Sequence, residues 1–175
     1  MADLSPQDST FRQETAASTV SAEPRSFAPE GPDALTLLAD DHREVERLID
    51  AYGAAASLLD KVSIAERLCL ALTIHAQIEE ELFYPALRQA GVDRADLDEC
   101  VVEHMTVRQL VTDLESAGVD DPLFDAKVRV LGEYVRAHVE EEEAQLFEAA
   151  RANLDLSLLG QRLAARKAEL CREAA

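Results

Sequence analysis

The chain has 175 residues, and with 17 Lys and Arg against 35 Asp and Glu its formal net charge is −18. So acidic a surface repels nucleic acid and anionic membranes, and neither is expected as a partner. No stretch reaches the ~18 apolar residues that span a bilayer. The first residues lack the basic start and apolar core of an export signal, which makes the cytoplasm the expected location.

The composition predicts an all-α protein. Glycine and proline number 6 each, aromatic residues make up 5%, and aliphatic residues recur at steps of three and four. Residues 1–32 differ, because they are rich in Ser, Thr and Pro and show no sustained period. We therefore expect a disordered leader over 1–32, followed by a length of chain that suits one domain.

The first predicted helix begins after Asp33, a residue type that caps helix N-termini. One of its faces carries Leu35, Leu38, His42, Val45, Ile49 and Tyr52. The second helix is predicted from near Ser63, with Glu66 completing a capping box, to Gly91. Pro85 should bend its last turns. Its inward stripe is Leu68, Leu72, His75, Glu79, Leu82 and Ala86.

The third predicted helix runs from about residue 94 to 117, and its inward stripe is Cys100, His104, Val107, Val111 and Leu114. The fourth begins near residue 122, and its stripe is Val128, Leu131, Val135, His138, Glu142, Gln145 and Ala149. The four patterns predict an antiparallel up-down four-helix bundle over 33–152. A further amphipathic helix within 153–175 would cap the bundle or pack on a partner.

The two halves of the predicted bundle repeat each other. His104 of the third helix follows His42 of the first at an offset of 62, and His138 of the fourth follows His75 of the second at an offset of 63. A helix pair used twice gives a bundle an approximate twofold axis. A site on that axis would receive equivalent ligands from both halves.

All four histidines fall on inward stripes, and two of them are followed four residues later by a glutamate. Positions i and i+4 lie one turn apart on the same helix face, so each such pair can reach one centre. The spacing predicts two metal ions, each bound by two histidines and bridged by both carboxylates. Imidazole and carboxylate ligands suit iron, manganese or zinc. The six predicted ligands are His42, His75, Glu79, His104, His138 and Glu142.

The competing interpretation is a set of ordinary core histidines. A single histidine on an apolar face is more often a hydrogen-bonded core residue than a ligand. Four unpaired imidazoles and two carboxylates in one core would cost several kcal/mol each, which favours a shared cation. The acidic runs 79–81 and 140–143 are ordinarily solvated surface, so only one glutamate of each is expected inside. Glu142 fits by spacing, Glu143 is its rival, and Glu80 should be dispensable.

Three more residues near the predicted centre receive ordinary interpretations. Cys100, one turn before His104, is expected to be a small buried apolar residue rather than a reactive thiol. Tyr84 is expected to pack in the core or to make an ordinary hydrogen bond. Arg108, one turn after His104, could pair with an acidic residue near the site or extend its side chain to water, and we expect the second.

Four segments together resemble the hemerythrin-like, or HHE cation-binding, family, and the similarity covers about residues 35–151. They are DDHREVERLI at 40–49, HAQIEEELFYPAL at 75–87, EHMTVRQL at 103–110 and HVEEEEAQLF at 138–147. The resemblance implies a non-haem di-iron centre with an oxo or hydroxo bridge. It also implies that His42 and His75 bind one iron, that His104 and His138 bind the other, and that Glu79 and Glu142 bridge them.

Oxygen-carrying hemerythrins place a further histidine where this chain has Arg108, so reversible oxygen carriage is not expected. The resemblance instead implies a di-iron protein that binds O₂ or reactive oxygen species and decomposes hydrogen peroxide in a catalase-like reaction. The alternative is an iron- or gas-responsive module that senses O₂ or NO without turnover. A closed bundle offers no mineral cavity, so iron storage is not expected.

Overall fold

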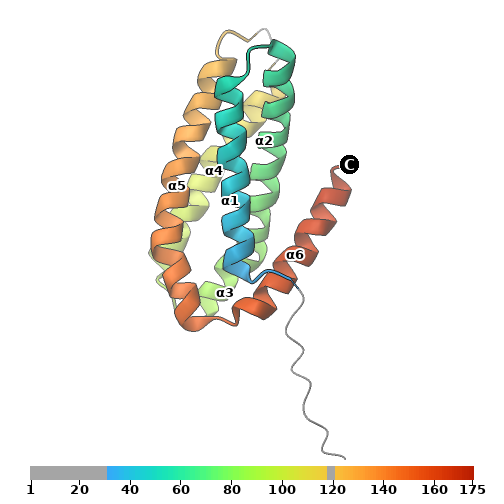
Figure 1. Ribbon diagram of the computed structural model, residues 1–175. Helices are drawn as coiled ribbons and strands as arrows, with labels where there is room; N and C mark the ends of the chain where they lie inside the picture. Colours follow the sequence, from blue (N-terminus) through green and yellow to red (C-terminus); the bar gives the residue numbers. More distant parts are fainter. Residues whose placement is uncertain (1–30, 118–120) are drawn as a thin grey trace, which may run out of the picture.

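The computed structural model of this chain describes residues 31–117 and 121–175, and within them it is all-α (Figure 1). The helices are α1 (Ala34–Ala54), α2 (Leu58–Ile78), the π-helical turn η1 (Glu79–Phe83), α3 (Tyr84–Gln89), α4 (Arg94–Ser116), α5 (Phe124–Asn153) and α6 (Leu156–Glu173). The segments α2, η1 and α3 follow one another without a break and form one rod. The leader predicted for 1–32 lies outside the described residues except for its last two.

The predicted four-helix bundle is confirmed. The helices α1, α2, α4 and α5 lie side by side, and short connections reverse the chain between consecutive rods (Figure 1). Helix α6 folds back against the outside of α1 and α2 rather than covering the end of the bundle. Among the described helices, none combines the length and the apolarity needed to cross a bilayer.

Side-chain caps fix where most of these helices begin. The Asp33 carboxylate accepts the Thr36 N–H at 2.9 Å, as the sequence predicts. The second helix begins earlier than predicted, because Ser57 rather than Ser63 caps it and accepts the Asp60 N–H at 3.1 Å. The capping box predicted around Ser63 therefore lies inside the helix.

The bend predicted at Pro85 takes the form of a π-helical turn. The Tyr84 N–H donates to the Glu79 carbonyl, five residues back instead of four. Pro85 has no N–H to offer the Glu81 carbonyl, and the wider turn lies directly before it. This turn begins at one of the predicted metal ligands.

The core consists of two apolar clusters with a polar layer between them. One cluster, near the α1 N-terminus, includes Leu38, Ile78, Phe83, Leu87 and Leu146. The other, toward the opposite end, includes Val45, Leu68, Leu72, Val111 and Leu131. Such a layer is stable only when its polar groups find partners.

The inward stripes run as predicted up to each of the two inner glutamates and then shift by one residue. After Glu79 the buried positions include Phe83 and Leu87, and after Glu142 they include Leu146 and Ala150. The predicted positions there were wrong, since Leu82, Ala86 and Ala149 are half-buried and Gln145 is exposed. Four-residue steps continue on both helices where three-residue steps were predicted.

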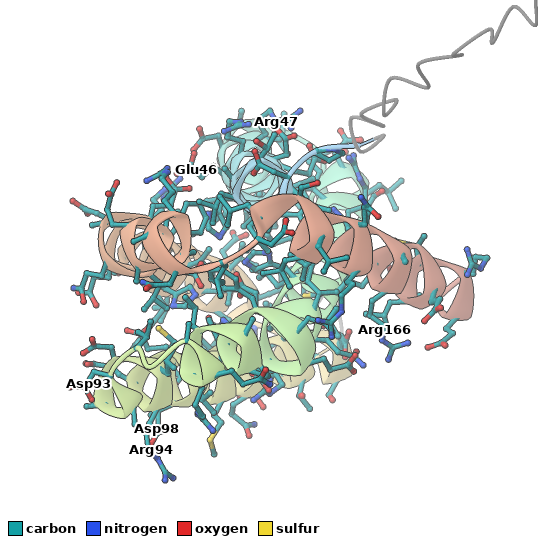
Figure 2. The ribbon with its side chains drawn as sticks, turned by 90° about the horizontal axis from the view of Figure 1, so that it is seen from below. Glu46, Arg47, Asp93, Arg94, Asp98 and Arg166 are labelled. Atoms are coloured by element: carbon teal, nitrogen blue, oxygen red, sulfur yellow. The ribbon has the colours of Figure 1, made fainter. Side chains whose placement is uncertain are left out.

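Charged side chains point outward around the bundle (Figure 2). The view along the helices shows Glu46 and Arg47 of α1 on one side and Arg94 and Asp98 of α4 on the opposite side. The Arg94 guanidinium donates to the Asp98 carboxylate at 3.0 Å. Exposed pairs of this kind contribute little to the free energy of unfolding. The feature that distinguishes this bundle is the buried polar layer.

Candidate metal centre

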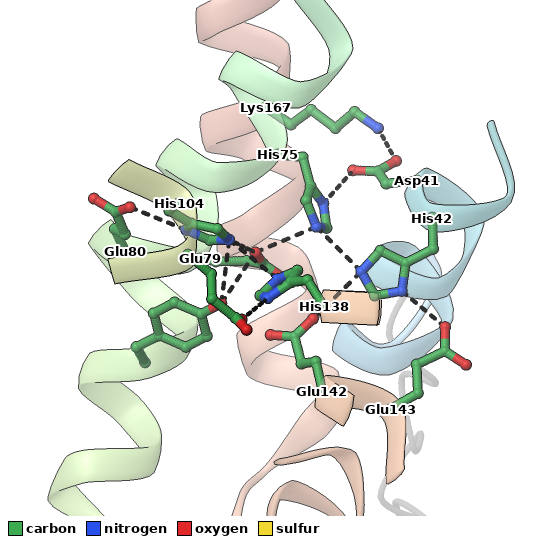
Figure 3. A network of polar contacts seen from close by, with 12 residues as sticks. Asp41, His42, His75, Glu79, Glu80, His104, His138, Glu142, Glu143 and Lys167 are labelled. Atoms are coloured by element: carbon green, nitrogen blue, oxygen red, sulfur yellow. Dashed lines mark hydrogen bonds and ion pairs between the residues drawn. The ribbon is translucent and has the colours of Figure 1, made fainter. Parts of the chain in front are cut away.

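Four histidines and two glutamates meet in the polar layer of the bundle (Figure 3). Each of the six residues is at most 5% exposed. They are His42 from α1, His75 from α2, Glu79 from η1, His104 from α4, and His138 and Glu142 from α5. All six residues that the sequence predicts as ligands therefore lie together.

The imidazoles form two pairs. The Nε2 atoms of His42 and His75 are 3.1 Å apart, and those of His104 and His138 are 3.2 Å apart. Two nitrogens that bind one metal at about 2.0–2.1 Å, at angles between octahedral and tetrahedral, would lie roughly 2.9–3.4 Å apart. Both pairs have the separation that a shared metal requires.

Glu79 stands between the two pairs of rings. Its Oε2 atom lies 3.2 Å from Nε2 of His75 and 3.4 Å from Nε2 of His104. Glu142 approaches from the other half of the chain, with its Oε2 atom 3.3 Å from Nε2 of His42. Each half thus lends a carboxylate to the histidines of the other, as expected of a site on a pseudo-twofold axis.

In the second half of the chain, the outer Nδ1 atom of each ring faces a further carboxylate. His104 Nδ1 lies 3.0 Å from Glu80 Oε1, and His138 Nδ1 lies 2.7 Å from Glu103 Oε2. An N–H on Nδ1 that donates to a carboxylate leaves the lone pair on Nε2, directed at the centre.

In the first ring pair, carboxylates also face the outer nitrogens, within hydrogen-bond distance at His42 and beyond it at His75. His42 Nδ1 lies 2.7 Å from Glu143 Oε1, and His75 Nδ1 lies 3.7 Å from Asp41 Oδ2. Glu143, the rival of Glu142, therefore faces the outer nitrogen of a ring while Glu142 faces an inner one. The side chain of Glu143 is 43% exposed, and that of Glu142 is fully enclosed.

Cations stand behind two of the outer carboxylates. The Arg108 guanidinium donates to Glu80 Oε1 at 2.6 Å, and the Lys167 ammonium of α6 donates to Asp41. Arg108 therefore contacts an acidic residue near the site instead of extending to water alone, and the dispensability of Glu80, which contacts His104, stays a prediction that its substitution tests. The spacing in the sequence identified which helix faces point inward. It did not predict that the long side chain of Arg108 on α4 reaches Glu80 of η1.

Burial and neighbouring charges perturb the protonation of this layer. Complete burial lowers the pKa of His75 to about 4, although the Asp41 carboxylate opposes the shift. Burial and then the charge of Glu142 raise the pKa of Glu79 well above its usual value. Although burial opposes the shift, the contact with His42 and the charges of the rings lower the pKa of Glu142 to about 2. A neutral imidazole suits metal binding, and the two adjacent inner carboxylates thus differ in the protonation state that they favour.

Several buried polar atoms have no partner within the protein. They are Oε1 of Glu79, both carboxylate oxygens of Glu142, Oδ2 of Asp41 and Nδ1 of His75. Three of these atoms are carboxylate oxygens of the inner site. Leaving such atoms unpaired costs free energy, and cations placed between them would satisfy all three. The donor set thus fits a pair of divalent metal ions.

Tyr84 borders the same site from the start of α3. Its hydroxyl donates to Glu79 Oε2 at 3.4 Å and lies 3.5 Å from His104 Nε2. Both contacts are long, and the ring is 2% exposed. The predicted interpretation, core packing with an ordinary hydrogen bond, agrees with this position.

The outer carboxylates are the residues that the sequence analysis missed. Asp41 and Glu103 each directly precede a histidine, at the same offset of 62, while Glu80 and Glu143 each directly follow an inner glutamate, at the offset of 63. The internal repeat therefore contained the signal, as an acid-His … His-xxx-Glu-Glu pattern used twice. No such pattern marked Lys167.

Comparison with known proteins agrees with this geometry. A crystal structure of a hemerythrin HHE cation-binding domain-containing protein from Mycobacterium kansasii matches with a TM-score of 0.71 and 24% identity, over 82% of this chain and 90% of the other. That likeness shows the fold.

A curated relative, a DNA nickase from Nostoc, is 36% identical over 83 residues, which are 47% of this chain and 23% of the relative. The chain thus spans about a quarter of that protein. The family model described as the hemerythrin HHE cation-binding domain matches residues 33–150. That match covers the four bundle helices except the last three residues of α5, and it includes all six inner side chains of the site, so this chain belongs to the hemerythrin HHE cation-binding domain family.

Proposed function

We propose that this chain is a cytoplasmic non-haem di-iron protein that binds O₂ or reactive oxygen species and decomposes hydrogen peroxide. His42 and His75 would hold one iron, and His104 and His138 the other. The observation that carries the proposal is the set of unpartnered carboxylate oxygens of Glu79 and Glu142 beside the two ring pairs. Two iron ions held there would supply two-electron redox chemistry.

The residues of the chain have distinct tasks in this proposal. The two inner glutamates would offset half of the charge of two divalent ions. The outer carboxylates keep each ring in the tautomer that binds metal. Tyr84 offers an O–H to Glu79 and would hold that carboxylate in place. The apolar clusters above and below limit water and larger reductants, so that small molecules such as O₂, peroxide or NO would reach the centre.

Oxygen evolution from hydrogen peroxide tests the enzymatic part. Protein loaded with two equivalents of iron should evolve oxygen faster than the same amount of free iron. His75→Ala should lose both the bound iron and the activity, because it removes an inner ligand. Glu140→Ala, on the exposed surface of α5, should keep both. A rate no higher than that of free iron would remove peroxide decomposition from the proposal.

A second candidate is an iron- or gas-responsive module without turnover, and the contacts of α6 favour it. Lys167 donates to Asp41 beside the His75 ring, and Arg166 donates to Glu81 of η1 at 2.7 Å and 3.1 Å. A change at the centre would thus reach α6 through two ion pairs. Hydrogen exchange of α6 in iron-free and iron-loaded protein tests this function, and equal exchange in both forms would refute it.

One relative is named a DNA nickase, which suggests an activity on DNA, but the match spans 23% of that protein. The net charge of −18 opposes contact with a polyanion. No action on nucleic acid is therefore part of the proposed function.

A further inference from the structure

A small acidic cleft lies between α4 and α5 and reaches the metal centre. Its volume is about 30 Å³, which is room for about one water molecule. Its acidic lining consists of Asp96, Glu99 and Glu103 from α4 and Glu141 and Glu142 from α5, and no Lys or Arg borders it. In the described part of the chain, Asp96, Glu99 and Glu141 form no ion pair within 4.0 Å.

The deep side of the cleft is formed by Glu142, whose carboxylate also faces the inner site. This residue is 1% exposed, and neither of its carboxylate oxygens has a hydrogen-bond partner, although Oε2 lies 3.3 Å from Nε2 of His42. An unpaired carboxylate at the end of an acidic cleft attracts a cation rather than an anion or an apolar molecule. The cleft therefore leads from the exposed carboxylates on the surface to the buried carboxylate of Glu142, which a cation would pair.

Three potential ligand atoms lie close together between the mouth of the cleft and the inner site. Cys100 Sγ, an oxygen of Glu103 and a ring nitrogen of His138 lie within 4.8 Å of one another. These atoms face the outer side of the His138 ring, whose inner side faces the metal centre.

The internal repeat shows that the acidic lining of the cleft occurs in the second half of the chain and has no counterpart in the first. Subtracting 62 from the α4 positions and 63 from the α5 positions gives the corresponding residues of the first half, Ala34, Leu37, Leu38, Asp41, Ile78 and Glu79. Four of these six are apolar and buried, and helix α6 packs over that face. The two halves contribute equivalent inner side chains, but among the described residues the cleft whose charged lining is wholly acidic lies beside those of the second half.

Two other cavities next to the centre carry cations. The cavity of about 270 Å³ beside Asp41 is lined by Arg67 and Lys167. The cavity of about 370 Å³ beside Glu143 is lined by Arg43 and Arg151. These linings also carry Asp41 and Glu44 in the first cavity and Asp33 and Glu143 in the second, so each has as many carboxylates as cations. The charged residues of the cleft between α4 and α5 are carboxylates alone, and it therefore attracts a divalent ion more strongly.

We infer that the cleft between α4 and α5 is the loading site through which Fe²⁺ reaches the metal centre, with Glu103 and Cys100 as its first protein ligands. The inference rests on the proposed metal centre. The exposed carboxylates Asp96, Glu99 and Glu141 raise the local concentration of the ion. Glu103 and Cys100 replace part of its hydration shell, since the cleft is too small for a fully hydrated ion. Glu142 then receives it.

The rate of metal uptake tests the loading site. Iron-free protein is mixed anaerobically with Fe²⁺ at low ionic strength, and uptake is followed by competition with a chromophoric chelator. The triple variant Asp96→Asn/Glu99→Gln/Glu141→Gln should load about ten times more slowly, at the lower end of electrostatic steering effects. Its final stoichiometry should equal that of wild type, because none of the three residues contacts the inner site. Raising the salt concentration should remove most of the difference.

A matched control changes the same charge elsewhere. Glu46→Gln/Glu66→Gln/Glu133→Gln alters three exposed carboxylates on other faces, and Glu46 lies opposite α4 in Figure 2. Cys100→Leu, which introduces the residue found at the corresponding Leu38, should also slow loading by filling the cleft. Cys100→Ser leaves the cleft open and should slow loading less.

The outcomes separate the two proposals. If wild-type protein binds no iron at saturation, the metal centre itself is refuted. If wild type and the triple variant both bind two equivalents at the same rate, or if the control variant is slowed equally, the loading site is refuted and the centre stands.

Discussion

Glu80→Ala separates an outer partner of the metal centre from ordinary acidic surface. The carboxylate lies 3.0 Å from Nδ1 of His104 and accepts from Arg108 at 2.6 Å. Its removal leaves the His104 ring free to rotate and to adopt the other tautomer. Loss of such a partner typically weakens metal binding by about 10–100-fold, or roughly 1.4–2.7 kcal/mol.

The same substitution should leave the iron-free protein nearly unchanged. The Glu80 side chain is 28% exposed and that of Arg108 is 42% exposed, and exposed pairs contribute about 0.2–1 kcal/mol. The effect of Glu80→Ala should therefore appear in iron retention and not in the unfolding of the apo form. Glu80→Gln keeps a hydrogen-bond acceptor without the charge and should fall between Glu80→Ala and wild type.

The assay is transfer of iron from the loaded protein to an excess of chelator, followed by absorbance. Glu140→Ala, in the other acidic run and exposed on α5, is the matched control and should retain iron like wild type. If Glu80→Ala and Glu140→Ala retain iron equally well, the outer carboxylate has no role in holding the metal, and the reasoning from Nδ1 contacts fails.

Three further outcomes are expected. Removing iron from protein with ligand at about 100 times its dissociation constant costs roughly 2.7 kcal/mol, so calorimetry should show a Tm lower by about 5–10 °C, and an unchanged Tm would contradict stabilisation by the metal. Gly160→Ala should destabilise by about 1–3 kcal/mol, because its Cβ would lie 2.5 Å from the Pro32 carbonyl oxygen, while Gly53→Ala, with nothing within 4 Å, should not. Burial raises the pKa of Glu79 in the folded apo protein, so the stability that its protonated form contributes is lost as the pH rises above the usual carboxyl range. The Tm of apo Glu79→Gln minus the Tm of apo wild type should therefore increase between about pH 5 and about pH 8, and a difference that stays constant would refute this.

The sequence was sufficient for the bundle and for the six inner side chains because helical period and i,i+4 spacing are local properties. His75 and Glu79 share a face whatever the rest of the chain does. The stripes became wrong after the inner glutamates, where the choice between three- and four-residue steps depends on neighbouring rods. The start of α2 was wrong because two serines, Ser57 and Ser63, offer similar caps.

The outer contacts could not be predicted in the same way. Whether Arg108 extends to water or to Glu80 depends on the distance between α4 and η1, which no single helix determines. Lys167 is far from Asp41 in the chain, and only the packing of α6 on α1 brings the two together. Contacts between long polar side chains of different helices are thus the part of the site that only the three-dimensional structure shows.

The exchange of carboxylates between the halves has an evolutionary consequence. A lone hairpin of α1 and α2 carries two histidines for one ion, but its glutamate also faces a histidine of the other half. Two copies of such a hairpin, associated head to head, would already enclose two ions before any covalent fusion. The offsets of 62 and 63 are those expected of such a doubled hairpin, and α6 packs on the hairpin of α1 and α2.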